Sequence, residues 1–271
     1  KMNSLINLKG KKGLILGIAN DKSIAWGIAK SLNEFGAELG FSYVNDSIKK
    51  RVEPLAQMCN SNIVLKCDVT CDSSIENFFD ELSKIWDSFD FLVHSIAFSD
   101  KNQLKGEYVN TSRENFINTL DVSCYSFTAL CQRAQSYMKS GGQILTLSYL
   151  GAERVMPHYN VMGIAKSALE TSVKYIAVDL GKKNIRVNAI SAGPIKTLAA
   201  SGISDFRYIL KWNEYNSPLG RVTSIDEVGK NSIYLLSDLS SGVTGEVIHV
   251  DCGYHVVGMK SVDAPDITVE R

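Results

Sequence analysis

The chain has 271 residues, 45% hydrophobic and 21% charged, as in an ordinary globular protein and unlike a disordered, collagen-like or disulfide-rich chain. Its 29 basic and 29 acidic residues give zero formal net charge, so no nucleic acid is expected as a partner, because nucleic-acid-binding proteins usually carry a basic excess. No apolar run approaches the roughly 18 residues of a membrane-spanning helix, so no membrane partner is expected either.

The six cysteines are scattered along the chain and lack the spacing of a metal site. Cys67 and Cys71 lie close together, but no further cluster of Cys or His follows, so no metal is predicted. Isolated cysteines are typical of a reducing compartment, and residues 1–4 lack the apolar core of a secretion signal. We therefore expect a cytoplasmic protein.

Short apolar runs alternate with longer helical patterns along the chain. Strands are predicted at 13–16, 38–43, 63–67, 89–95, 143–148, 186–190 and 246–250. Helices are predicted at 23–35, 47–58, 73–86, 111–138, 159–180 and 225–236. Runs such as 144–147 are almost wholly apolar, which indicates strands buried on both faces of a parallel sheet. The pattern predicts one α/β domain over residues 1–271: a doubly wound parallel sheet of about seven strands with helices on both faces.

Ligands of such sheets bind beyond the carboxyl ends of the strands, so the residues that follow each strand are the first candidates for a site. After the first strand, Gly17 can turn the backbone tightly, and the amides of Ser23 and Ile24 can point from a helix N-terminus toward a pyrophosphate. Gly27 would let this helix pack closely on the strand. The stretch departs from G-x-G-x-x-G, so an ordinary turn with a serine cap is an equal alternative.

The third and fourth strands are followed by further candidates. Asp68 can accept a hydrogen bond from an adenine amino group while the Val69 amide donates to a ring nitrogen, although a turn-capping Asp is equally common. Around Ile96, small residues would let a cofactor run close to the backbone. His94 is interpreted as a hydrogen-bonded core histidine and not as a catalyst, since nothing near it resembles a triad.

Tyr159 and Lys166 lie seven residues apart on a predicted helix. At about 100° per residue they differ by about 20° around the axis and by about two turns along it. A phenol can polarise a carbonyl or protonate an enolate, and an ammonium can bind ribose hydroxyls and favour the phenolate. The spacing alone fits a core tyrosine and a solvated lysine better. Their position after the fifth strand, opposite the proposed cofactor turn, favours catalysis.

Segment 194–221 interrupts the alternation of strands and helices. Residues 195–199 could place backbone groups against a carboxamide, with Thr197 near a phosphate. A surface loop is the plain alternative, but the apolar Ile203, Phe206 and Ile209 favour a flap that covers an apolar ligand.

Together these residues resemble the bacterial NADH-dependent enoyl-acyl-carrier-protein reductases, a divergent branch of the short-chain dehydrogenase/reductase superfamily. The resemblance extends from Leu8 to Gly258 and is carried most strongly by residues 23–29, 145–152, 159–163 and 186–206. It implies a single-domain Rossmann-type fold.

The spacing of the active-site residues is the most specific part of this resemblance. Ordinary superfamily members carry a Tyr and a Lys four apart, whereas Tyr159 and Lys166 have the longer spacing of the enoyl reductases, with a second tyrosine, Tyr149, ten residues earlier. Thr146 replaces the usual serine thirteen residues before the tyrosine. These departures make a carbonyl reductase of the same fold, such as a 3-oxoacyl reductase, the less favoured alternative. A non-catalytic nucleotide sensor is a second alternative.

The resemblance implies reduction of trans-2-enoyl thioesters on acyl carrier protein to saturated acyl thioesters by hydride transfer from NADH, the last step of each cycle of fatty-acid elongation. It implies an active site of Tyr149, Tyr159 and Lys166. The residues expected to hold the nucleotide are Gly17, Ser23, Ile24, Val44, Asp68, Val69, Ile96, Lys166, Ile195, Lys196, Thr197, Leu198 and Ala199. Those expected to contact the substrate are Ser99, Tyr149, Met156, Tyr159, Met162, Ile203 and Phe206.

The resemblance also bears on the nucleotide and on protein partners. The stretch 44–46 has no Lys or Arg to meet a 2′-phosphate, so NADH is expected over NADPH, although residues 49–51 are basic. An acidic acyl carrier protein would deliver the substrate, and Arg207 and Lys211, four apart, could form a local basic patch or simply a solvated helix face. Relatives imply a homotetramer.

Overall fold

The computed structural model describes residues 6–267, and its centre is a sheet of seven strands, each parallel to its neighbours. The strands are β1 (Lys12–Leu16), β2 (Glu38–Tyr43), β3 (Val64–Lys66), β4 (Phe91–His94), β5 (Gly142–Ser148), β6 (Ile185–Ala192) and β7 (Val247–Val250). Their order is β3-β2-β1-β4-β5-β6-β7, so the direction of winding reverses between β1 and β4. This confirms the predicted Rossmann-type doubly wound sheet, whose ligand crevice lies at that reversal.

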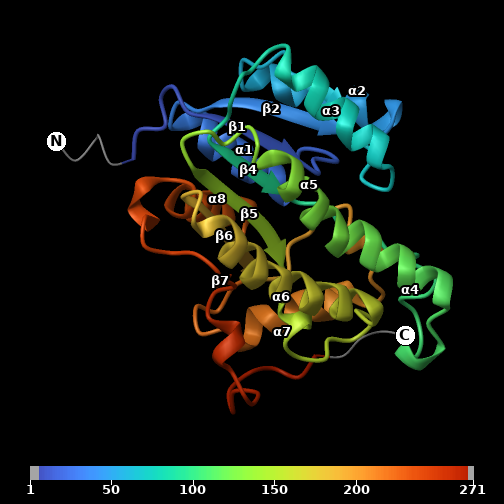
Figure 1. Ribbon diagram of the computed structural model, residues 1–271. Coiled ribbons are helices and arrows are strands. Elements are labelled where there is room, and N and C mark those ends of the chain that lie inside the picture. Colours follow the sequence, from blue (N-terminus) through green and yellow to red (C-terminus); the bar gives the residue numbers. More distant parts are fainter. Residues whose placement is uncertain (1–5, 268–271) are drawn as a thin grey trace.

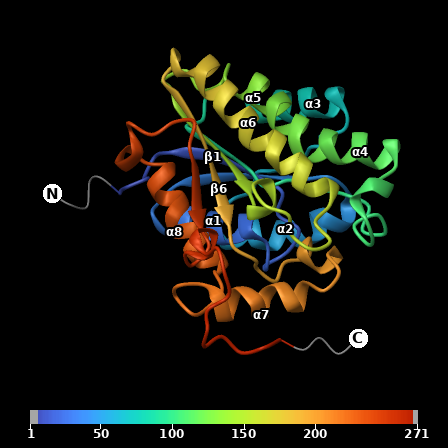
Figure 2. The same cartoon turned by 90° about the horizontal axis from the view of Figure 1, so that it is seen from below.

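Helices cover both faces of the sheet, as Figure 2 shows from below. One layer holds α1 (Ile24–Glu34), α2 (Asp46–Met58) and α8 (Ile225–Leu235), and the other holds α3 (Asp72–Ser83), α5 (Ser126–Ala134) and α6 (Val161–Gly181). Each layer buries its own cluster of apolar side chains against the sheet. Burial on both faces explains why the strand sequences are almost continuously apolar.

The predicted helix 111–138 is interrupted in the structure. It comprises α4 (Arg113–Leu120), a π-helical turn over Asp121–Tyr125, and α5, which ends at Ala134. The wider turn carries Ser123, whose hydroxyl exchanges hydrogen bonds with the backbone of Phe98 in the loop after β4. Turns of this kind are frequent at functional sites, and this one lies at the carboxyl edge of the sheet.

The predicted helix 159–180 begins later than expected. His158 and Asn160 have φ values of 57° and 43°, in the left-handed region, so helical geometry starts only at Val161. Tyr159 therefore precedes the helix that carries Lys166, and the expectation that both residues share one helical face was wrong. Only the tertiary structure can place the two side chains relative to each other.

Segment 194–221 contains a short 3-10 turn at Ala200–Gly202 and the helix α7 (Phe206–Asn216). This helix lies below the ends of the strands in Figure 1, outside both layers. Residues 1–5 and 268–271, the ends of the predicted domain, lie outside the described residues. Between residues 6 and 267, no helix has both the length and the apolar character needed to cross a membrane.

Candidate active site

The turn after β1 is shaped by Gly17, as predicted. Its φ is 105°, and a Cβ added there would lie 2.0 Å from the carbonyl oxygen of Ser95, in the loop after β4. Only glycine permits this approach, so the turn packs directly on the loop after β4, at the point where the winding of the sheet reverses. Because Gly17 has no side chain, its backbone is accessible along the crevice in which a dinucleotide binds in folds of this type.

Ser23 closes the same turn from the other side. It precedes α1 and is buried, and its hydroxyl oxygen accepts hydrogen bonds from the amides of Ala19 (3.0 Å) and Asn20 (3.1 Å). The hydroxyl thus holds the shape of the loop and makes no cap bond to the helix. The first amides of α1 keep the orientation that favours an anion.

Gly27 differs from its expectation. An added Cβ would lie 2.4 Å from the carbonyl oxygen of Ile225 in α8, and a Cβ on Gly229 would lie 2.5 Å from the oxygen of Gly27. The glycine therefore lets α1 pack on α8 and not on the strand. The error arose because local sequence does not show which element a helical glycine faces.

The adenosine end of the crevice lies at the ends of β2 and β3. Asp68 accepts hydrogen bonds at Oδ1 from the amide (3.0 Å) and the hydroxyl (2.7 Å) of Thr70, so this oxygen caps a turn, as the plain interpretation required. Its Oδ2 has no hydrogen bond among the described residues. Val69 is buried beside it, whereas Val44, after β2, is exposed. These positions agree with a nucleotide edge, and their contacts with a ligand remain predictions.

The two predicted tyrosines meet at the carboxyl end of β5. The rings of Tyr149 and Tyr159 lie edge to face, with centroids 5.0 Å apart and an interplanar angle of 76°. Burial raises the pKa of both phenols above the ordinary value, so both are protonated at neutral pH. The Tyr149 hydroxyl is buried and has no hydrogen-bond partner among the described residues, which leaves a polar atom for a ligand.

An apolar cluster surrounds these rings and brings together most of the predicted substrate residues. Met156, Met162 and Ile203 all belong to it. The sequence interpretation missed five further members: Val161 and Ala165 on α6, Leu104 in the loop after β4, and Phe116 and Leu120 on α4. The apolar positions of the predicted helix 111–138 were a signal for the last two, but its period could not show that this end of the helix covers the tyrosines.

Lys166 is fixed one turn into α6. It is buried, and its Nζ donates a hydrogen bond of 2.8 Å to the carbonyl oxygen of Leu147 in β5. Burial lowers the pKa of this lysine to about 8. The ammonium therefore lies at the carboxyl edge of the sheet, at the position that the sequence predicted for a ribose-binding charge.

His94 is a core histidine, as interpreted from the sequence. Its Nδ1 lies 2.8 Å from the Thr146 hydroxyl and its Nε2 lies 2.8 Å from the Ser126 hydroxyl. Burial, aided by the charge of Lys166, lowers its pKa to about 3, so the imidazole is neutral. The hydroxyl of Thr146, which replaces the superfamily serine, is thus engaged inside the sheet with His94 and takes no catalytic position.

Ser99, a predicted substrate neighbour, is held by α4. Its hydroxyl accepts hydrogen bonds from Thr119 Oγ1 (2.9 Å) and from Asn115 Nδ2 (3.2 Å). Thr119 and Asn115 are themselves buried. This polar group fixes the loop after β4 beside the tyrosine cluster.

A cavity of about 820 Å³ separates the nucleotide turn from the segment 194–221. Asn20 and Lys22 line one side, and the opposite side includes Lys196, Thr197, Leu198, Ile203 and Phe206.

Phe206 was expected beside Met156 and Met162 but is absent from their cluster and lines this cavity instead. Ile195 packs on the core and Ala199 precedes the 3-10 turn, where the Thr197 hydroxyl accepts a hydrogen bond from the amide of Ala200. Within residues 6–267, no group of three or more Cys, His, Asp or Glu could hold a metal ion.

The parallel sheet has a glycine turn where its winding reverses, and a buried tyrosine and a buried lysine follow β5. This arrangement defines a dinucleotide-binding oxidoreductase of the short-chain dehydrogenase/reductase type. The family model described as enoyl-(acyl carrier protein) reductase matches residues 17–255. The chain therefore belongs to the enoyl-(acyl carrier protein) reductase family, as the resemblance in its sequence indicated.

Individual relatives agree with this assignment. The enoyl-[acyl-carrier-protein] reductase [NADH] 1 of Rhizobium meliloti (strain 1021) is 64% identical over 262 residues, which cover 97% of this chain and 96% of that protein. The crystal structure of the Anaplasma phagocytophilum reductase in complex with NAD has a TM-score of 0.91 at 59% identity, covering 96% of this chain and 97% of that one. The Bacillus cereus enoyl-acyl carrier protein reductase, solved with NADP+ and indole naphthyridinone, has a TM-score of 0.91 at 48% identity, covering 93% and 99%.

Proposed function

We propose that this chain reduces trans-2-enoyl thioesters carried on acyl carrier protein to saturated acyl thioesters with NADH, the last step of each cycle of fatty-acid elongation. The observation that carries the proposal is the buried pair Tyr149 and Tyr159, inside an apolar cluster at the carboxyl edge of the sheet. Such a site suits an apolar acyl chain whose carbonyl needs a hydrogen-bond donor.

The crevice fits a dinucleotide. Gly17 provides a turn that any Cβ would fill, and in this proposal the amides at the start of α1 bind the pyrophosphate. When bound, NADH supplies the hydride that reduces the β-carbon of the substrate. In this proposal Lys166 holds the hydroxyls of the nicotinamide ribose, because its ammonium is already fixed at the end of β5.

Tyr159 acts on the substrate itself. As hydride adds to the β-carbon, negative charge develops on the thioester oxygen, and the protonated phenol of Tyr159 donates a hydrogen bond to it. This bond is strongest once the charge has developed, which lowers the barrier more than it tightens ground-state binding. The surrounding apolar side chains exclude water and strengthen the interaction further. Uptake of a proton at the α-carbon then gives the saturated thioester. Tyr149, which packs on the Tyr159 ring, shapes the pocket.

The residues after β2 favour NADH over NADPH. Asn45 caps α2 by accepting a hydrogen bond from the amide of Ile48 (3.0 Å), and Asp46 adds a negative charge to the first turn. A 2′-phosphate placed there would be repelled by this carboxylate. The next basic residue along the sequence, Lys49, pairs with Glu53 on its own helix.

The proposal extends to the carrier protein, the assembly and the compartment. Arg207 and Lys211 are exposed on α7, and Arg207 also lines the large cavity, so an acidic carrier docked there would deliver its acyl chain beside the site. Association as a homotetramer is supported by apolar side chains such as Tyr175 and Val178, which α6 leaves exposed. A cytoplasmic location is supported by the six cysteines, all of which are free thiols.

The direct test follows NADH oxidation with crotonyl thioester, run in parallel with NADPH. We expect turnover that requires both the enoyl substrate and NADH. Reduction of acetoacetyl thioester in place of crotonyl thioester would identify a carbonyl reductase. Tight NADH binding without turnover on any enoyl chain length would identify a nucleotide sensor. Either outcome contradicts the proposal.

A further inference from the structure

The exit of the segment 194–221 is attached to the turn that follows β7, and its entry follows the paired ends of β6 and β7. Before its entry, the amide of Gly193 donates a hydrogen bond to the carbonyl oxygen of Val250 (2.9 Å), the last residue of β7, and so continues the pairing of β6 with β7. At its exit, the amide of Leu219 donates to the carbonyl oxygen of Cys252 (3.3 Å). This turn is therefore an anchor for the exit of a segment that otherwise lies outside the two helical layers.

The backbone of Cys252 is unusual for a residue with a side chain. Its φ is 56°, in the left-handed region, and Gly253 follows with a φ of 84°. The Cβ of an L-residue is crowded in this conformation, whereas glycine adopts it freely. A strained residue persists where its surroundings hold it, and the side chain of Cys252 makes contacts that glycine would lose.

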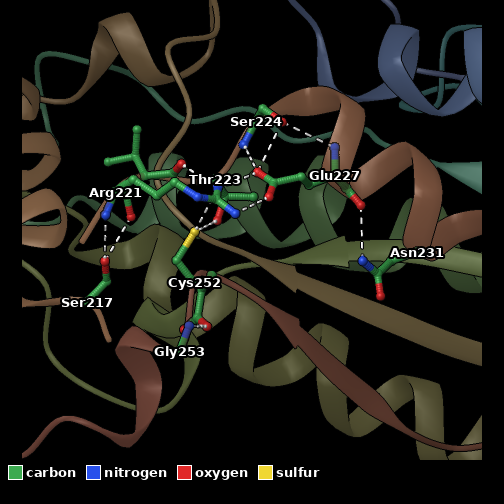
Figure 3. A network of polar contacts seen from close by, with 10 residues as sticks. Ser217, Arg221, Thr223, Ser224, Glu227, Asn231, Cys252 and Gly253 are labelled. Atoms are coloured by element: carbon green, nitrogen blue, oxygen red, sulfur yellow. Dashed lines mark hydrogen bonds and ion pairs between the residues drawn. The ribbon is translucent and has the colours of Figure 1, made fainter. Parts of the chain in front are cut away.

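Figure 3 shows these contacts. Arg221 donates from Nη1 to the Sγ of Cys252 (3.4 Å), and the hydroxyl of Thr223 lies 3.5 Å from the same sulfur. The guanidinium also pairs with Glu227, with Nη2 2.7 Å from Oε1. Arg221 therefore joins the exit of the segment to two fixed points, the turn after β7 and the first turn of α8.

The α8 end of this connection leads to the nucleotide turn. Helix α8 packs on α1 without space for a side chain at Gly27, and Lys30 of α1 pairs with Asp226 of α8 (2.8 Å). Helix α1 begins at Ile24, directly after the turn that starts at Gly17. The guanidinium is thus connected through two tightly packed helices to the loop that would hold the pyrophosphate.

We infer that Arg221 and Cys252 are a positioning pair, which sets the position of segment 194–221 over the cofactor crevice. The inference rests on the proposed role of this segment as a substrate flap. Neither side chain lines the large cavity or belongs to the tyrosine cluster. Both act through the flap, and their loss affects how well the substrate is held and leaves the chemical step intact.

Two variants at one position separate positioning from stability. Cys252→Ala removes the sulfur and keeps the strained backbone, whereas Cys252→Gly removes the sulfur and relieves the strain. We expect the alanine variant to be less stable to heat than the wild type and the glycine variant to be more stable. Both variants should show the same several-fold rise in KM for crotonyl thioester, with kcat and NADH affinity little changed. Hydrogen–deuterium exchange of the amides in 197–216 should become faster in both variants. The hydroxyl of Cys252→Ser can still accept a hydrogen bond from Arg221. In this variant KM and the exchange rates should return part of the way to their wild-type values.

The glycine variant is the decisive one. If Cys252→Gly is more stable than the wild type and keeps its KM and its exchange rates, the thiol has no positioning role and the inference fails. The exchange measurement needs no substrate, so it still tests the positioning pair if the wild type proves inactive on enoyl thioesters, a result that would contradict the proposed function instead.

Discussion

The ring of Tyr159 meets the ring of Tyr149 edge to face, although the two residues leave from opposite ends of a loop between β5 and α6. Gly151 makes room for this contact, since an added Cβ there would lie 2.2 Å from the Tyr159 ring. The left-handed residues His158 and Asn160 turn the backbone on either side of Tyr159. The phenol is therefore fixed by its neighbours before any ligand binds, which is the condition for effective stabilisation of a developing charge.

Changing Tyr159 to Phe tests this role. The ring packing is kept and the hydrogen-bond donor is lost, so we expect kcat to fall by about 10²–10³-fold, as for the loss of one donor to a developing oxyanion. NADH affinity, measured by fluorescence titration, should be unchanged because the ribose is assigned to Lys166. Tyr149→Phe serves as the matched control and should lose less turnover. Equal losses of turnover and of NADH affinity in Tyr159→Phe would contradict the assignment.

The lowered pKa of Lys166 predicts that NADH affinity depends on pH. Burial lowers its pKa to about 8, below the ordinary lysine value of 10.5, so the ammonium loses its proton at a lower pH than an exposed lysine. The charge is present below pH 8 and is lost above it. We expect NADH affinity to weaken as the pH rises from 7 to 9, and Lys166→Met to bind NADH weakly over the whole range. A wild-type affinity that stays constant to pH 10 would exclude this role.

His94 predicts a loss of stability in acid. Its pKa of about 3 in the folded state lies below the ordinary value of 6.5, so the unfolded chain takes up the proton first as the pH falls. Its contribution is complete above pH 6.5 and declines toward pH 3, by up to about 1.4 kcal/mol per pH unit. Urea unfolding between pH 7.5 and 4 should show this decline in the wild type.

The matched variant is His94→Asn. It should be less stable at pH 7.5, because hydrogen bonds to Thr146 and Ser126 are lost, yet its unfolding free energy should fall less steeply with acid. Parallel pH profiles for the two proteins would show that His94 does not cause the decline.

The close contact at Gly27 predicts that even a small side chain there lowers the free energy of unfolding. Gly27→Ala would force its methyl group against the backbone of α8, so we expect a loss of about 1–3 kcal/mol in the free energy of unfolding. Gly181→Ala, at the end of α6, has open space around the added carbon and is the control. It should be neutral or slightly stabilising, because alanine favours the helix more than glycine. Similar denaturation midpoints for both variants would rule out the tight contact.

The basic pair on α7 predicts a selective effect on the carrier. Reversing both charges, with Arg207→Glu and Lys211→Glu, should raise KM for an enoyl chain on acyl carrier protein and leave KM for the short crotonyl thioester unchanged, because only the carrier is acidic. The difference should shrink at high salt, since exposed charges are screened. Unchanged kinetics with the carrier-bound substrate would remove α7 from the docking surface.

The order of the elements and the location of the candidate site residues could be predicted from the sequence. Alternating apolar runs and helical patterns report local burial, and all seven predicted strands are present in a parallel sheet. The turn at Gly17 and the residues Tyr149, Tyr159 and Lys166 follow strand ends, so their position at the carboxyl edge follows from the topology alone.

What only the tertiary structure decided is the partner of each side chain. Gly27 faces α8 and not a strand, Thr146 serves His94, and Leu120 covers the tyrosines, although none of these pairs is close in the sequence. Tyr159 lies outside its predicted helix because a left-handed residue, Asn160, separates them. Local periodicity shows which face of an element is buried. The neighbour that buries it depends on how distant elements pack, and that packing forms only when the whole chain folds.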